Sequence, residues 1–251
     1  MKIIAIIQAR MGSTRLPGKM MLDLYGKPVI ERVFERIKPS HFINEIWLAT
    51  TINPEDDVLV DWAQKNKIKF FRGSSDDVLD RFYQAAAPIQ ADAIVRITGD
   101  CPLHDFQVID KVIAEYVQGG HDYVSNSHPP TYPDGLDLEV FSFQALKKAW
   151  SEAELKSERE HVTPYIWKHP DIFKIKNVVN AVDLSDQRWT LDTKEDWEFL
   201  KIIFQEIEIR KEYGHLSEVV AILQEHPEWL KINSQYKRNE GYQKSLKEDC
   251  V

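Results

Sequence analysis

Two glycines, a proline and three cations fall within the stretch from Gln8 to Lys19. An apolar run, Ile3–Ile7, precedes this stretch and is typical of a strand buried on both faces of a sheet. Gly12 and Gly18 allow tight turns and let the backbone come close to a ligand. The formal net charge of the chain is -8, so a cluster of cations in one loop is opposite in sign to the charge of the whole chain. The loop therefore predicts an anion site, with phosphate as the favoured anion. The three cations are Arg10, Arg15 and Lys19.

The loop does not match two familiar nucleotide-binding motifs. A Walker A motif has four residues between its glycines and a Ser or Thr after its lysine. Here five residues separate Gly12 from Gly18, and Met20 follows Lys19. The Gly-x-Gly-x-x-Gly fingerprint of Rossmann dinucleotide sites is also absent. The alternatives that remain are a phosphate loop of another kind and a surface connection with solvated cations, and the clustering of charge favours the first.

Two aspartates follow expected strands and could meet this loop. Asp100 comes after the apolar run Ala93–Ile97, and Asp192 comes after the segment Arg188–Leu191. Open parallel sheets bind ligands beyond the carboxyl ends of their strands, so we expect both carboxylates beside the cationic loop. Mg²⁺ takes one or two carboxylates and completes its octahedron with phosphate oxygens and water. The combination predicts a magnesium and polyphosphate site, although each aspartate alone would equally suit a turn or a helix start.

The composition excludes several classes of protein. At 251 residues, 43% of them hydrophobic, the chain can bury a sizeable core. Lys and Arg number 32 against 40 Asp and Glu, which argues against general nucleic-acid binding and against attachment to an anionic membrane surface. With only Cys101 and Cys250, neither a disulfide framework nor a zinc cluster is expected. The apolar runs are too short for a signal peptide or a membrane span, so the cytoplasm is the simplest location.

Strands and helices are expected to alternate through the first half of the chain. Helix starts are marked by Pro28, by Pro54 after Asn53, and by a capping Ser74 or Ser75. This alternation predicts an α/β fold with a mostly parallel sheet covered on both faces. The expected strands are residues 3–7, 46–51, 67–71, 93–97 and, after a helix over 106–116, 123–125.

The pattern changes over residues 127–185, where we expect a small inserted arm or lid. Its first residues are rich in proline and cannot form regular structure. Leu136–Phe141 then alternates like a half-buried strand, with Asp137 and Glu139 on the polar side. Two short helices around 144–150 and 158–168 and a strand at 173–179 complete the arm.

The chain is expected to end in two helices and a tail. Thr193 and Asp196 form a capping box that starts a helix running to about residue 212, and a shorter helix follows over 217–224. Residues 234–251 are polar, lack an apolar period and are expected to form a mobile tail. The predicted organisation is one domain over residues 1–233, with the arm inserted, followed by the tail.

Four stretches resemble the cytidylyltransferases that activate acidic sugars. They are Gln8–Lys19, Gly99–Leu103, Gly135–Val140 and Leu191–Asp196. The similarity extends over about residues 1–210, to the CMP-Kdo and acylneuraminate cytidylyltransferases and most closely to the group named after spore coat polysaccharide biosynthesis protein F. It implies a GT-A-like three-layer fold, CTP and Mg²⁺ as cosubstrates, and a homodimer joined through the arm.

The resemblance also implies roles for individual residues. The loop residues Arg10, Gly12, Ser13, Arg15 and Lys19 correspond to the triphosphate loop, and Asp100 and Asp192 to the carboxylates that bind the metal. Arg72 and Ser74 would lie near the base, and Asp137 and Glu139 near the acceptor sugar, although a structural role suits these four as well. His161 belongs to a stretch typical of the spore coat group and has no assigned role. One departure is Gln8, where the Kdo and neuraminate enzymes carry a proline, so the identity of the sugar stays open.

The expected reaction is nucleotidyl transfer. An acceptor oxygen attacks the α-phosphorus of CTP and pyrophosphate leaves, so catalysis depends on positioning and on stabilisation of the developing charge. Arg15 and Lys19 would stabilise pyrophosphate, while Asp100 and Asp192 would hold Mg²⁺. Alternatives are a different nucleoside triphosphate, a glycosyltransferase of the same fold, and a nucleotide-binding regulator without chemistry. Glycosyltransferases of this fold usually present Asp-x-Asp after the fourth strand, whereas Cys101 and Pro102 follow Asp100 here.

Overall fold

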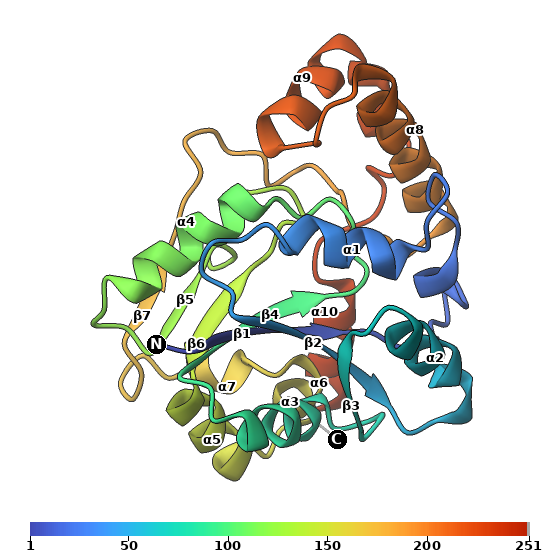
Figure 1. Ribbon diagram of the computed structural model, residues 1–251. Helices are drawn as coiled ribbons and strands as arrows, with labels where there is room; N and C mark the ends of the chain where they lie inside the picture. The colour runs from blue at the N-terminus through green and yellow to red at the C-terminus, as the bar shows by residue number, and fades with distance from the viewer. Residues whose placement is uncertain (250–251) are drawn as a thin grey trace.

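A seven-stranded sheet runs through the centre of the molecule in the computed structural model, which describes residues 1–249 (Figure 1). The strand order is β3-β2-β1-β4-β6-β5-β7, and β6 pairs antiparallel with both of its neighbours while the other pairs are parallel. The mostly parallel α/β sheet expected from the sequence is therefore confirmed. The strands are β1 (Ile3–Gln8), β2 (Glu45–Thr51), β3 (Lys69–Gly73), β4 (Ala93–Thr98), β5 (Tyr123–Ser125), β6 (Glu139–Ser142) and β7 (Ile175–Asn177).

β1 lies between β2 and β4 and is buried on both sides. Ile3, Ala5 and Ile7 pack into one hydrophobic cluster, and Ile4 and Ile6 pack into another. Successive side chains of a strand point to opposite faces, so an uninterrupted apolar run suits a strand that is covered above and below. The rigid packing of β1 fixes the position at which its loop leaves the sheet.

Helices cover both faces of the sheet and complete three layers (Figure 1). Helices α1, α2 and α4 share the cluster that contains the odd-numbered side chains of β1, whereas α3, α5 and α7 share the other. The expected three-layer sandwich is therefore present. The helices are α1 (Val29–Ile37), α2 (Asp57–Lys65), α3 (Val78–Ala86), α4 (Phe106–Val117), α5 (Phe143–Glu152), α6 (Lys156–His161), α7 (Pro164–Trp167), α8 (Lys194–Arg210), α9 (Leu216–Glu225) and α10 (Glu240–Glu248).

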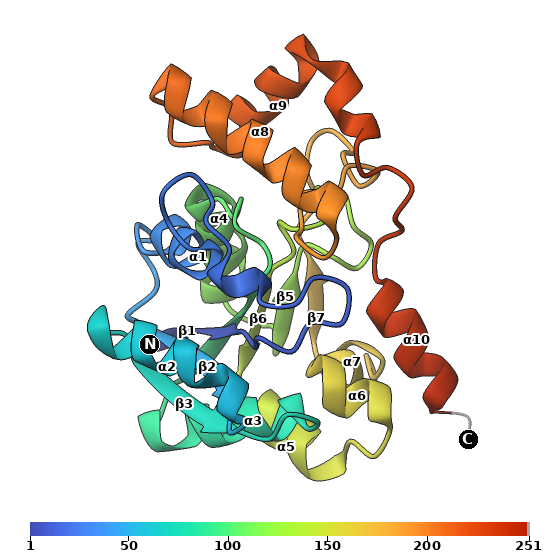
Figure 2. The ribbon, with the colours of Figure 1, turned by 90° about the vertical axis from the view of Figure 1, so that its right-hand side faces the viewer.

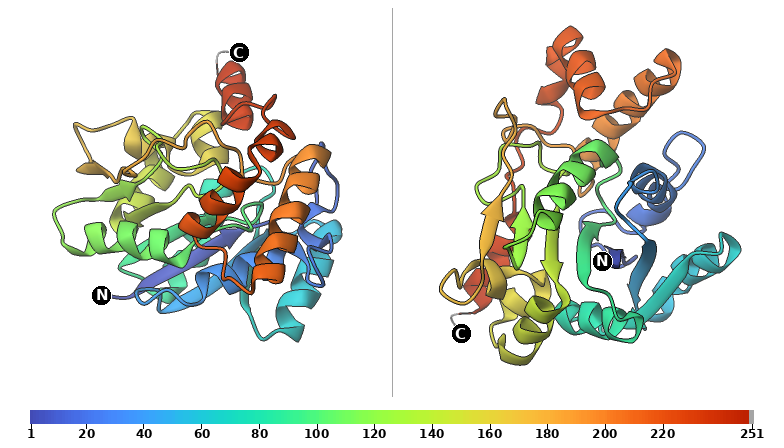
Figure 3. Two further views of the ribbon diagram at one scale, coloured as in Figure 1. Left: turned by 90° about the horizontal axis from the view of Figure 1, so that it is seen from above. Right: turned by 60° about the vertical axis from the view of Figure 1, so that its left-hand side comes forward.

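Helices α8 and α9 form a separate packing unit at one end of the molecule (Figures 1 and 3). Trp189 and Leu191 are fully buried in its hydrophobic cluster and anchor the start of α8. The expected capping box is present, because the Thr193 hydroxyl accepts from the Asp196 amide and the Asp196 carboxylate accepts from the Thr193 amide.

Among the described residues, no helix is both long and apolar enough to cross a bilayer.

The region over residues 127–185, expected as an inserted arm, extends the main sheet and one helical layer. β6 joins β4, β7 joins the edge, and α5 and α7 pack on the same face as α3. The half-buried strand was predicted to begin at Leu136, but β6 begins at Glu139, because Leu136 and Leu138 lie in a loop bound to the side chain of Asn126.

Two expectations about the end of the chain are wrong. Arg188–Leu191 is not a strand, because only Arg188 makes a bridge, to Asp134, outside the sheet. Part of the predicted mobile tail forms helix α10, which lies beside α6 and is joined to the α8–α9 unit by an irregular segment (Figure 2). Residues 250–251 of that predicted tail lie outside the described part of the chain.

Candidate active site

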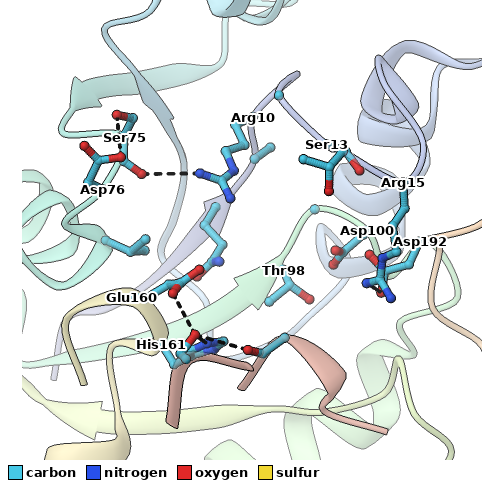
Figure 4. A pocket seen from close by; sticks show the side chains of 18 of the residues that line it. Arg10, Ser13, Arg15, Ser75, Asp76, Thr98, Asp100, Glu160, His161 and Asp192 are labelled. Carbon is cyan, nitrogen blue, oxygen red and sulfur yellow. Dashed lines mark hydrogen bonds and ion pairs between the residues drawn. The ribbon is translucent and has the colours of Figure 1, made fainter. Parts of the chain in front are cut away.

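A cavity of about 700 Å³ opens at the carboxyl ends of β1 and β4. The loop that follows β1, the turn after β4 and the start of α3 form much of its lining, and α6 and α10 form a further wall. Figure 4 shows Ser75 and Asp76 at one side, Asp100 and Asp192 at the other, and Glu160 and His161 opposite the loop. The cavity is therefore built from segments spread along the whole sequence, and its volume is in the range of ligand sites.

The loop after β1 is held in one conformation by its own hydrogen bonds. The Met11 carbonyl accepts from the amides of Ser13 and Gly18, and the Ser13 hydroxyl accepts from the Leu16 amide. Gly18 has φ 73°, a left-handed conformation that glycine adopts without strain. The Met11 amide donates to the buried carboxylate of Asp56 over 2.6 Å, which ties the loop to the end of β2.

Several backbone groups of this loop are available to a ligand. Within residues 1–249, the amides of Gly12, Thr14 and Arg15 donate no hydrogen bond. All three residues line the cavity. Free amides in a glycine-containing loop are the donors that anionic oxygens need, so the loop is suited to bind an anion.

Lys19 joins the two aspartates that the sequence singled out. Its ammonium lies 2.8 Å from Asp100 and 2.9 Å from Asp192, and it also donates to the Leu191 carbonyl over 2.7 Å. Lys19 is 6% exposed, whereas both carboxylates keep part of their surface open to the cavity. The two carboxylates therefore converge on Lys19, whereas the sequence predicted that they would share Mg²⁺ and that Lys19 would face phosphate.

The charges of this triad stabilise one another. Burial acts to lower the pKa of Lys19, but Asp100 and Asp192 outweigh it and the pKa is raised. Burial acts to raise the pKa of Asp100, but Lys19 outweighs it and lowers this pKa to about 2. Lys19 and Asp100 are therefore both charged at neutral pH, and the Lys19 ammonium is directed toward the aspartates.

Two arginines complete the surroundings of Asp192. Arg15 lies 2.9 Å from its carboxylate, and Arg188 lies 3.2 Å from the same oxygen. Arg188 is itself buried and makes two 2.9 Å bonds to Asp196, which is fully buried, and one of 3.0 Å to Asp134. Asp192 is therefore held in place by a network behind the cavity wall.

The remaining loop cations reach toward opposite sides of the cavity. Arg10 makes a long 3.4 Å hydrogen bond to the Ser75 carbonyl, so its guanidinium is weakly held. Arg15 makes a second ion pair, of 2.8 Å, with Glu240 of α10.

The turn after β4 comes close to the loop because Gly99 has no side chain. A Cβ at this position would lie 2.9 Å from the Ala9 Cβ and 3.0 Å from the Gln8 carbonyl oxygen.

This geometry is accompanied by similarity to proteins of one family. Residues 4–244 match the family model described as Cytidylyltransferase. The chain belongs to the cytidylyltransferase family. Spore coat polysaccharide biosynthesis protein SpsF of Bacillus subtilis is 32% identical over 238 residues, which cover 90% of this chain and 95% of that protein.

Solved structures of cytidylyltransferases have the same fold. One from Leptospira borgpetersenii is 36% identical with a TM-score of 0.85 and covers 92% of this chain and 97% of that one. CMP:2-keto-3-deoxy-manno-octonic acid synthetase complexed with CTP has a TM-score of 0.63 at 18% identity, covering 82% of this chain and 99% of that one. The nucleotide-sugar transferase-like fold expected from the motifs is therefore confirmed, and family membership favours nucleotidyl transfer over glycosyl transfer.

Two residues predicted to lie near the base do not line the cavity. The Arg72 guanidinium donates to the carbonyls of Thr51 and Asn53 and pairs with Asp57, so it holds the loop after β2. The Ser74 hydroxyl accepts from the amides of Asp76 and Asp77 before α3. The structural role that the sequence left open is the one that these contacts support, and the adjacent Ser75 lines the cavity instead.

Asp137 and Glu139, predicted to lie near the acceptor, also do not line the cavity. Asp137 pairs with Arg238, in the segment before α10. Glu139 is 5% exposed, so the expected solvated strand face is wrong at this position. Its carboxylate accepts from Arg96, Tyr123 and Thr163.

Sequence reasoning missed part of the cavity lining. Residues of α6 and α10 line it although the end of the chain was predicted to be a tail; they are Lys156, Glu160, His161, Glu240, Gly241, Lys244, Ser245 and Glu248. Gln8 also lines it, and its side-chain carbonyl accepts from Arg96, which in turn pairs with Glu139. The sequence singled out Gln8 and His161 as features of the spore coat group, without placing either of them in the cavity.

Proposed function

We propose that this cytidylyltransferase transfers CMP from CTP to an acidic sugar, releasing pyrophosphate and forming a CMP-sugar for surface polysaccharide synthesis. The observation that carries the proposal is the convergence of Asp100 and Asp192 on Lys19 beside a loop with free amides. The similarity to SpsF and to a synthetase crystallised with CTP supports both the nucleotide and the class of acceptor.

The loop after β1 and the two aspartates have different roles in the proposed reaction. The acceptor hydroxyl oxygen attacks the α-phosphorus and forms a new phosphorus–oxygen bond, and its proton is released to water. The bond between the α-phosphorus and the oxygen that bridges to the β-phosphate breaks, and its electron pair leaves on pyrophosphate. The amides of Gly12, Thr14 and Arg15 bind the triphosphate oxygens. The Arg15 guanidinium stabilises the charge that develops on pyrophosphate, and Lys19 keeps the two aspartates oriented.

Asp100 and Asp192 fit a divalent cation. Both are carboxylates with surface open to the cavity, and the Asp100 oxygen that does not bind Lys19 lies 3.6 Å from the Cys101 thiol. Among residues 1–249 no third His, Cys, Asp or Glu joins them in a metal-binding group. Mg²⁺ favours a coordination shell of one or two carboxylates together with phosphate oxygens and water. When bound, the ion would supply positive charge that orients the α-phosphate and offsets the charge developing on it.

The proposal is tested by pyrophosphate release. Purified protein is incubated with CTP, UTP, GTP or ATP and with 2-keto-3-deoxy-manno-octonic acid, N-acetylneuraminic acid or neutral sugars, with and without Mg²⁺. We expect release with CTP and an acidic sugar, and loss of release when Mg²⁺ is chelated. Release with another nucleotide alone would exclude CTP as the donor, and nucleotide binding without turnover on any sugar would exclude the transferase.

A further inference from the structure

His161, at the end of α6, lines the cavity and has no assigned role. Its Nε2 lies 3.0 Å from the hydroxyl of Ser245 in α10. The same hydroxyl lies 2.7 Å from a carboxylate oxygen of Glu160 and 3.1 Å from the Gly241 carbonyl. Figure 4 shows Glu160 and His161 together on the side of the cavity opposite Arg10 and Ser13.

These contacts determine which nitrogen of His161 carries the proton. The Ser245 hydroxyl has one hydrogen, and its two acceptor neighbours, the Glu160 carboxylate and the Gly241 carbonyl, both require it. The Ser245 oxygen is therefore the acceptor toward His161, and Nε2–H is the donor. In the neutral ring this leaves Nδ1 with a free lone pair.

Nδ1 of His161 is available to accept a hydrogen bond from a ligand. Within residues 1–249 it has no hydrogen-bond partner, and it is not among the unpaired polar atoms that are sealed from solvent. Burial, followed by the charge of Arg96, lowers the pKa of His161 to about 4, although Glu160, Glu139 and Asp249 act in the opposite direction. The ring is therefore neutral at pH 7, so Nδ1 acts as an acceptor and not as a donor.

The wall that carries His161 has the chemistry of a sugar site. Apart from Gly241, every residue that α6 and α10 contribute to the cavity is polar or charged. Ala9 and Val78 also line the cavity and contribute apolar atoms suited to the face of a base. A polyhydroxylated sugar needs polar partners at several hydroxyl groups, which the α6–α10 wall supplies.

We propose that Nδ1 of His161 accepts a hydrogen bond from a hydroxyl group of the acceptor sugar, and that the bond from Nε2 to Ser245 fixes the ring for this purpose. The inference rests on the proposed transferase function and adds a residue of α6 to the acceptor site. It assigns the α6–α10 wall to the sugar and leaves the Ser75 side to the nucleoside.

Two substitutions separate the two nitrogens of the ring. His161→Gln places an amide nitrogen near the position of Nε2 and can keep the bond to Ser245, but it removes the acceptor at Nδ1. His161→Asn does the reverse, because its side-chain oxygen lies near the position of Nδ1 and cannot reach Ser245. The initial rate of pyrophosphate release is measured for each variant against both the acidic sugar that gives the highest rate and CTP, and the melting temperature is measured as a check on folding.

We expect His161→Gln to raise the KM for the sugar about tenfold with the KM for CTP unchanged, since one hydrogen bond to a hydroxyl is lost. His161→Asn should retain more of the affinity for the sugar. Equal losses in the two variants, or a loss that follows the melting temperature, would show that His161 only joins α6 to α10 and would overturn the inference alone. Sugar kinetics like wild type in His161→Gln would also overturn it, whereas wild-type protein without pyrophosphate release would overturn the proposed function together with the inference.

Discussion

Arg15 and Glu240 lie 2.8 Å apart and join the loop after β1 to the last helix. The Arg15 guanidinium is also expected to bind the triphosphate, so the Glu240 carboxylate and the nucleotide compete for it. Binding of CTP must therefore weaken or replace this ion pair, and the strength of the pair is open to measurement.

The substitution Glu240→Gln should tighten CTP binding. Both side chains of the pair are 40% exposed, so the effect is expected to be small, about two- to fivefold in Kd. Isothermal titration with CTP gives the value. Glu248→Gln is the matched control, because Glu248 lines the same wall but pairs with Lys156. If the two variants bind CTP alike, Glu240 does not compete with the nucleotide.

Asp100→Asn should abolish most of the turnover and leave the fold intact. The carboxylate is expected to hold the metal at the α-phosphate, so its loss should lower kcat by a factor of about 100 or more. Thermal unfolding should change less than for Lys19→Met, because the isosteric amide keeps the shape of the site and Lys19 stays paired with Asp192. Asp76→Asn serves as the control, since Asp76 lines the cavity without contacting Lys19. Normal activity in Asp100→Asn would remove Asp100 from the site.

Lys19→Met should affect both activity and stability. Lys19 is buried, and its loss leaves Asp100 and Asp192 facing each other without the shared cation. Removing one partner of a buried charge cluster typically costs about 3 to 5 kcal/mol. Urea unfolding at pH 7 measures this loss. The double variant Lys19→Met, Asp100→Asn should recover part of it, and a double variant as unstable as the sum of the single ones would show that the groups do not interact.

Asp134 is expected to make stability depend on pH. Burial, with a contribution from Asp137, raises the pKa of Asp134 to about 7, although Arg188 and Arg238 oppose the shift. A carboxyl group whose pKa is higher in the folded state binds more protons there, so it stabilises the fold at low pH, and this contribution is lost as the pH rises from about 4 to about 7. Asp134→Asn should therefore become more stable relative to wild type across that interval. Urea unfolding at pH 4, 5, 6 and 7 tests this, and a difference that does not change with pH would contradict it.

The sequence was most informative where burial leaves few choices. The uninterrupted apolar run of β1 predicted a central strand, and the rule that ligands gather at carboxyl ends brought Asp100 and Asp192 together although 92 positions separate them. Asp192 lies close to Asp100 although Arg188–Leu191 is not a strand, because Arg188, Asp196 and the buried Trp189 hold that segment in place.

The errors arise where polar side chains are buried by partners distant in the sequence. Glu139 alternates with apolar residues and so resembled an exposed strand position, but Arg96 and Tyr123 enclose it. α10 packs against α6 through polar contacts such as that between Ser245 and His161, and such a seam has no apolar period for a pattern to detect. Lys19 was predicted to face phosphate, because a sequence does not reveal that the turn after Gly18 directs it back toward the aspartates.

The burial of Lys19 makes it distinguishable from the other lysines by chemical labelling. An amine must lose its proton before it can be acylated, and the raised pKa of Lys19, together with its enclosure, should leave it unmodified. Lys244 lines the same cavity on an exposed part of α10 and should react readily. Mass spectrometry of protein treated with an acylating reagent would thus use Lys19 as an internal marker of an intact triad and Lys244 as a reporter of whether the α6–α10 wall is covered.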